Sequence, residues 1–124
     1  MRLLLWVLAL YHGANGLLMV AAPLGWFRAV PGVAETGAAN AHFIADVGWG
    51  FLAAAVALAL AARGGPGRGP LVLAALVFLG GHAAMHVLDF LRHGFGTAAL
   101  RDSATVVLPG LLPFIPLLKG QDDA

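Results

Sequence analysis

The chain has 124 residues, of which 60% are hydrophobic and only 10% charged, and its formal net charge is +1. Soluble domains carry charge on about a quarter of their residues, so this composition, with a mean hydropathy of +0.88, excludes a soluble protein. The low net charge and the lack of Lys/Arg clusters also argue against a nucleic-acid partner. Without cysteine, disulfides and thiolate metal sites are excluded. We expect one integral membrane domain covering residues 1–124.

The first predicted span covers residues 3–22. It resembles a signal peptide, because Arg2 precedes a Leu-rich run that ends in small residues. Pro23 would directly follow the cleavage site, however, and the polar residues His12 and Asn15 interrupt the apolar run. These features favour a transmembrane helix that is retained.

Residues 23–40 form the longest predicted connection, and several prolines and glycines interrupt it. Trp26, Phe27 and Arg28 are typical of an anchor at the level of the lipid headgroups. We therefore expect this connection to lie on the membrane surface as a partial lid. Thr36 or Asn40 is predicted to cap the helix that follows.

Three further apolar stretches complete the predicted architecture. Each holds about 20 residues, which at ~1.5 Å per residue spans a ~30 Å hydrocarbon layer. The fold class is an all-α membrane protein, an antiparallel bundle of four transmembrane helices. Prolines are expected to kink the second half of the last span. The last three spans cover residues 41–62, 70–91 and 97–118.

The distribution of basic residues predicts the topology, since cytoplasmic loops carry an excess of Lys and Arg. Four spans place both termini on one side of the membrane. That side would carry Arg2, Arg63, Arg68 and Lys119, and the other side Arg28, Arg92 and Arg101. We therefore predict a multi-pass protein of the bacterial inner (cytoplasmic) membrane with cytoplasmic N- and C-termini.

The third span contains His82, His86 and Asp89, four and then three residues apart. This spacing places all three on one face of a helix. Imidazole and carboxylate groups in hydrocarbon are costly unless they are paired, and they usually mark functional sites. No Lys or Arg is expected inside the spans to compensate them, so a bound cation or shared protons should do so.

Counting residues from the turn near Gly67 places Asp46 of the second span at about the height of His86. The first span brings polar groups to the same half of the bundle. His93 is expected in a loop, and Asp102 as an exposed charge near the start of the last span. The predicted cluster comprises His12, Asn15, His42, Asp46, His82, His86 and Asp89, with Asp102 as a further candidate.

A pattern in and before the second span, followed by the histidines of the third, resembles a group of small bacterial four-span membrane proteins. Those proteins share a PG..ETG..N.HF..D.G stretch and a His-rich third helix. The resemblance covers residues from about 26 to 90. It implies the four-span architecture and no particular activity. The matching residues are Pro31, Gly32, Glu35, Thr36, Gly37, Asn40, His42, Phe43, Asp46, Gly48, His82, His86 and Asp89.

The leading hypothesis for function is a non-haem metal site for Zn, Fe, Mn or Cu. Helical His pairs four residues apart, with nearby carboxylates, suit such metals in bundle cores. With an open coordination position, the metal could activate water or oxygen for chemistry on a lipophilic small molecule in the surrounding membrane lipid. The predicted metal ligands are His42, Asp46, His82, His86 and Asp89, and His12 and Asn15 are candidate cofactor-binding residues.

Three alternatives stay open from the sequence. The polar cluster could only hold helices together, as in an accessory or structural subunit of a larger membrane complex. A b-type haem could be held by His12 with His82, or by His42 with His86. A proton or metal-ion carrier would use the His and Asp groups as a relay, and four short spans would then favour a homo-oligomer.

Overall fold

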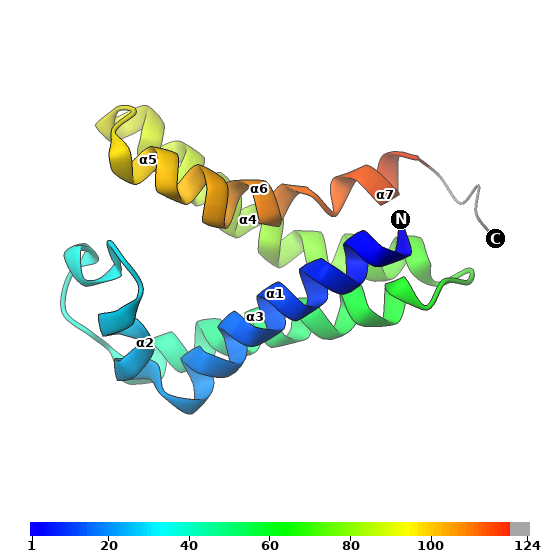
Figure 1. Ribbon diagram of the computed structural model, residues 1–124, viewed down its shortest axis with the longest axis horizontal. Coiled ribbons are helices and arrows are strands. Elements are labelled where there is room, and N and C mark those ends of the chain that lie inside the picture. The colour runs from blue at the N-terminus through cyan, green and yellow to red at the C-terminus, as the bar shows by residue number, and fades with distance from the viewer. Residues whose placement is uncertain (120–124) are drawn as a thin grey trace.

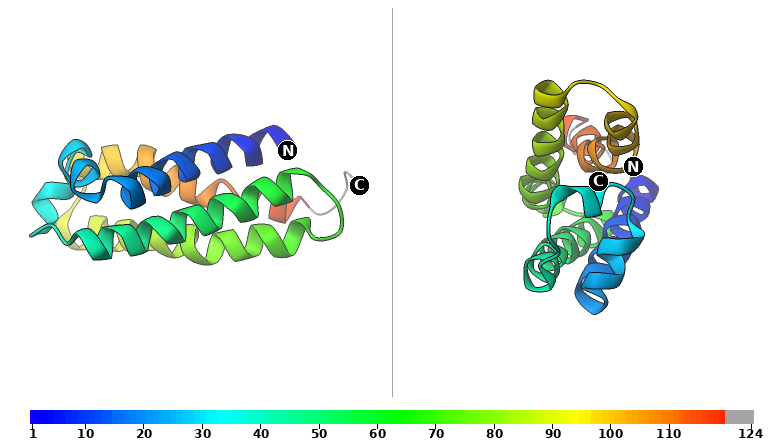
Figure 2. Two further views of the ribbon diagram at one scale, coloured as in Figure 1. Left: turned by 90° about the horizontal axis from the view of Figure 1, so that it is seen from below. Right: turned by 90° about the vertical axis from the view of Figure 1, so that its left-hand side faces the viewer.

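The structure of this chain is a computed structural model that describes residues 1–119. Every regular element within those residues is helical. Four helical stretches are long and apolar enough to cross a membrane, which confirms the predicted helical membrane architecture at this level. Figures 1 and 2 show them running along the long axis of the molecule, with the N-terminus and the end of α7 at one end.

The elements follow the predicted spans closely. The first span is α1 and the second is α3, while α2 and the short 3₁₀ helix η1 lie in the connection between them. The last span is built from four consecutive helical pieces. The bounds are α1 Arg2–Ala21, α2 Pro23–Ala29, η1 Val33–Thr36, α3 Ala41–Ala62, α4 Arg68–His93, α5 Thr97–Asp102, η2 Ser103–Val107, α6 Leu108–Leu111 and α7 Phe114–Leu118.

Helix α4 is longer than predicted by two residues at each end. Arg92 and His93 continue it because basic side chains are favourable beside the exposed carbonyls of a helix C-terminus. His93 is therefore the last residue of α4 rather than a loop residue. Its Nδ1 lies 3.1 Å from the backbone oxygen of Asp89. The predicted cap at Asn40 is confirmed, since its side-chain oxygen accepts a hydrogen bond from the Phe43 amide at 3.1 Å.

Glycines on both helices allow α1 and α3 to pack closely against each other. A Cβ added at Gly16 would lie 2.7 Å from the backbone oxygen of Gly48, and one at Gly48 would lie 2.8 Å from Cβ of Met19. Helices in a bilayer gain most of their attraction from such close packing, which only small residues allow. Gly110 plays the same part between the last span and α4, where its added Cβ would lie 2.9 Å from the Leu79 oxygen.

The last span departs from a regular α-helix where proline removes backbone donors. Pro109 and Pro113 have no N–H to give to the carbonyls of Thr105 and Pro109, four residues earlier. Within η2 the chain makes a π-helical turn, in which the Leu108 amide donates to the Ser103 oxygen, five residues back. Such turns are often associated with functional sites.

Helix α1 supplies donors for the carbonyls that the prolines leave free. The Tyr11 hydroxyl donates to the Thr105 oxygen at 2.7 Å, and Nε2 of His12 lies 3.3 Å from the Pro109 oxygen. An unpaired carbonyl inside a membrane costs several kcal/mol. These two contacts therefore tie the first span to the last.

Replacing Tyr11 with Phe should lower the free energy of unfolding by about 0.6–1.7 kcal/mol, the range for hydrogen bonds between membrane helices. The ring and its packing are kept, and only the donor to Thr105 is lost. Unfolding in mixed detergent micelles would measure the difference. As a control, Thr105→Val should have a smaller effect, because the Thr105 hydroxyl donates only to Arg101 of its own helix. Equal stability of Tyr11→Phe and the unmodified chain would contradict this assignment.

The connection 23–40 folds back over one end of the molecule, near the start of the last span (Figure 1). Its Trp26 indole donates to the Asn15 side-chain oxygen at 2.9 Å, which fixes α2 against α1. Gly32, at φ 85°, lies directly against the Arg101 guanidinium, and a Cβ at this position would overlap it. The connection thus contacts both α1 and the last span at this end. Its role as a lid and its place on the membrane surface stay predictions.

Candidate functional site

The side chain of His86 lies at the contact between α4 and α5. Its Nδ1 is 3.0 Å from Oδ2 of Asp102, and both side chains are partly buried. A carboxylate can only accept, so this contact assigns the proton to Nδ1 of His86. In the neutral imidazole, Nε2 then carries the free lone pair. A histidine oriented in this way by a carboxylate is the common arrangement of metal-ligating histidines.

Asp102 is held in place by a second partner. Its other oxygen, Oδ1, accepts a hydrogen bond from Nε of Arg101 at 2.8 Å. Arg101 also lies within the last span and contacts Gly32 of the connection, so a chain of contacts links that connection to His86. The expectation of an exposed Asp102, and of no basic residue inside the spans, was therefore wrong. The sequence places both residues near a helix start, but the packing sets Asp102 against His86 of α4 and Arg101 against Gly32 of the connection.

His82 lies one helical turn before His86, and the two ring centroids are 5.1 Å apart. Aromatic rings surround it, since Phe51 packs edge-on at 5.3 Å and Phe78 is stacked at 6.1 Å. Among residues 1–119, its imidazole has no hydrogen-bond partner within the protein. His82 and His86 thus form a pair of imidazoles on one face of α4, as the spacing predicted.

His12 extends this row of rings toward α1. It is buried, with 3% of its surface exposed, and it stacks on Phe51 at 5.8 Å. Phe51 therefore contacts both His12 and His82. The sequence placed His12 at the depth of His82, and the structure brings the two to the same aromatic side chain. Nε2 of His12 already faces the Pro109 oxygen, so its environment is that of a helix-packing residue.

Asn15 is also accounted for by contacts inside the protein. Its oxygen accepts the Trp26 indole N–H, and its amide lies 3.5 Å from the sulfur of Met19. The side chain thus orients α2 on α1. The open alternative of interhelical hydrogen bonding describes both Asn15 and His12 better than cofactor binding does.

The predicted ligands from α3 lie elsewhere. His42 and Asp46 pair with each other at 3.3 Å, and their side chains are 90% and 61% exposed. Asp89 is exposed as well. Residue counting matched the heights of these groups along the axis, but it did not determine the direction in which each helix faces. The carboxylate beside His86 is accordingly Asp102, from the last span, rather than Asp46 or Asp89.

Within the described part of the chain, no three His, Asp or Glu side chains are grouped so that they could hold a metal ion. The structure therefore does not bring the five predicted ligands into one such group. What it provides is two imidazoles, His82 and His86, with Asp102 and Arg101 behind the second.

No protein-family model, curated protein or solved structure matches this chain. The resemblance to small bacterial four-span membrane proteins thus stays a prediction, and function must be argued from the site alone.

Proposed function

We propose that this protein is an integral membrane metalloprotein, an antiparallel bundle of four transmembrane helices in which His82 and His86 bind a divalent metal. One observation carries the proposal: Nδ1 of His86 faces Asp102 at 3.0 Å, which directs the Nε2 lone pair away from that carboxylate. Imidazoles four residues apart on a helix suit Zn, Fe, Mn or Cu. Asp102 fixes the orientation of His86.

Two imidazoles leave coordination positions open on such a metal. Water, a lipophilic small molecule from the surrounding lipid, or a side chain from a second copy in a homo-oligomer would fill them. The aromatic rings of Phe51 and Phe78 around His82 keep this region apolar. With an exchangeable position, the metal would supply Lewis-acid or water-activating chemistry.

Metal analysis of the detergent-purified full-length protein, together with its absorption spectrum, tests this proposal. We expect about one divalent metal per chain or per dimer and no Soret band. A Soret band in a protein that contains no stoichiometric non-haem metal would establish the haem alternative instead. If the protein contained no stoichiometric metal and showed no Soret band, the metal-site proposal would be wrong.

The second candidate is an accessory or structural subunit of a membrane complex. It is favoured by the contacts of Tyr11 and His12 with proline-freed carbonyls and by the Asn15–Trp26 bond. In that case the polar groups would serve helix packing only. Substitution of His86 would then lower stability and change no ligand content.

We further propose that both termini are cytoplasmic in the bacterial inner membrane. Arg2 and Arg68 lie together at one end, and the turn between α3 and α4 at that end also carries Arg63. We expect a reporter enzyme that is active only in the cytoplasm to be active when it is fused to the C-terminus. A fusion in the connection 23–40 provides the matched control and should show the opposite activity. A periplasmically active C-terminal fusion would contradict the orientation.

A further inference from the structure

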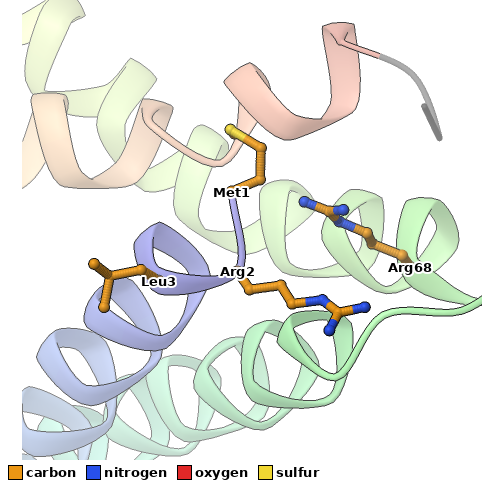
Figure 3. A pocket seen from close by; sticks show the side chains of 4 residues that line it. All are labelled: Met1, Arg2, Leu3 and Arg68. Carbon is orange, nitrogen blue, oxygen red and sulfur yellow. The ribbon is translucent and has the colours of Figure 1, made fainter. Parts of the chain in front are cut away.

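A hollow of about 350 Å³ lies between the first turn of α1 and the first turn of α4 (Figure 3). Met1, Arg2, Leu3 and Arg68 line it. The two arginines come from different spans, 66 positions apart in sequence, counting from 2 to 68. This hollow is at the opposite end of the molecule from α2 and α5, so it is separate from the His86 site.

Arg68 is unusually placed for a basic residue. It is only 8% exposed, and its Nε has no hydrogen-bond partner among residues 1–119. A buried charge is costly unless it is paired and hydrogen-bonded. The ion pairs found among residues 1–119 involve neither Arg68 nor Arg2. The structure therefore buries most of the Arg68 side chain and leaves its Nε without a partner among residues 1–119, which favours an anionic ligand at this position.

Arg2 is directed to the same region by the turn between α3 and α4. Its guanidinium lies over Gly64, where an added Cβ would be 2.8 Å from it. Gly64 has a φ of 88°, so both its conformation and its lack of a side chain suit this contact. The N-terminus of the 26-residue helix α4 adds its partial positive charge, and its first turn contains no acidic residue.

We propose that this hollow binds the phosphate group of an anionic phospholipid. Arginine forks match phosphate oxygens in bidentate geometry, and basic pockets between membrane helices are suited to acidic headgroups. The hollow lies where two spans begin, which is the level of the headgroups. Leu3 beside it is 76% exposed, so it offers an apolar surface to an acyl chain. A free phosphate ion would use the same two guanidinium groups but would gain nothing from Leu3.

Native mass spectrometry of the full-length protein in detergent, titrated with phosphatidylglycerol, tests the site. Removing one arginine fork should weaken binding about tenfold, the loss of one charge-assisted contact. We expect that loss for Arg68→Gln and for Arg2→Gln, and a smaller one for Arg68→Lys, which keeps the charge. Arg63→Gln removes the same charge from an exposed position in the adjacent turn and should change binding less than about twofold.

Two further ligands distinguish the source of the phosphate. Phosphatidylcholine and inorganic phosphate should each bind at least about tenfold more weakly than phosphatidylglycerol. Inorganic phosphate binding as tightly as the lipid, with loss in Arg68→Gln, would overturn the lipid assignment. Because Arg68 is buried and its replacement could unfold the chain, the exposed Arg2 gives an independent test. If Arg2→Gln melts like the unmodified protein and retains phosphatidylglycerol as strongly as Arg63→Gln does, the site is wrong.

The acidic residues Asp122 and Asp123 are a competing source of negative charge. If these carboxylates occupied the hollow, replacing both with Asn would strengthen phosphatidylglycerol binding. In a chain that keeps both aspartates, Arg68→Gln would then not weaken that binding. We expect instead that the tail substitutions leave lipid binding within about twofold.

Discussion

Replacing His86 with Ala is expected to abolish metal binding by the purified protein. His86 would provide one of two protein ligands, and no group of three metal-ligating side chains exists within residues 1–119 that could hold the metal without it. The affinity should therefore fall by more than the roughly 10–100-fold typical of losing a supporting residue. Because imidazole binds metal only when it is neutral, acidification should also release the metal from the unmodified protein. Metal content per chain, measured after purification and dialysis, gives the result directly.

Three variants separate this expectation from a general effect on the fold. Asp102→Asn keeps the shape but removes the charge that orients His86, so metal affinity should fall about 10–100-fold. Asp46→Asn should leave metal content unchanged, since Asp46 pairs with the exposed His42. His93→Ala, at the end of α4, should also have no effect. If His86→Ala lowers only thermal stability while metal content is unaltered or absent throughout, the cluster serves helix packing and the metalloprotein proposal fails.

Gly16→Ala should destabilise the protein by about 1–3 kcal/mol, the usual cost of adding a carbon to a well-packed contact. The new Cβ would lie 2.7 Å from the Gly48 backbone oxygen, and a backbone atom cannot move aside as a side chain can. Helices α1 and α3 would have to move apart at this contact. Reversible unfolding in mixed micelles would measure the change.

Gly81→Ala is the matched control for this substitution. Gly81 is also inside a long helix, but no atom lies within 4 Å of the position of its added Cβ. We expect a change of less than about 0.5 kcal/mol, since exposed positions away from special features tolerate substitution. If the two variants proved equally stable, the glycine contact between α1 and α3 would not determine stability.

The helices themselves could be predicted because hydrophobicity sustained over about 20 residues has few other interpretations. The limits of α4 were less accessible. Arg68 and Arg92 appeared to belong to polar turns, yet each lies within the helix. Charged residues are compatible with the first and last turns of a helix, so composition alone marks the edge of the apolar core rather than the end of the helix.

The candidate site could be predicted only in part. The spacing of His82 and His86 fixes their shared face, and their ring contact confirms it. Asp46 and Asp89 were preferred over Asp102 as the carboxylate partners because residue counting gives height along a helix and not rotation about its axis. Asp46 has a suitable height but faces outward, whereas Asp102 faces His86. Its rotation depends on how the last span packs against α4, which the sequence of that span does not reveal by itself.

The π-helical turn in η2 makes the register of the last span dependent on a single residue. Asp102 and Gly110 are eight positions apart, which in a regular α-helix separates their directions by about 80°. One extra residue in the turn reduces this to about 20°, so both residues can face α4, where His86 and Leu79 contact them. A chain shortened by one residue between positions 103 and 107 could therefore present Asp102 or Gly110 to α4, but not both. We therefore expect this segment to tolerate substitutions but not insertions or deletions.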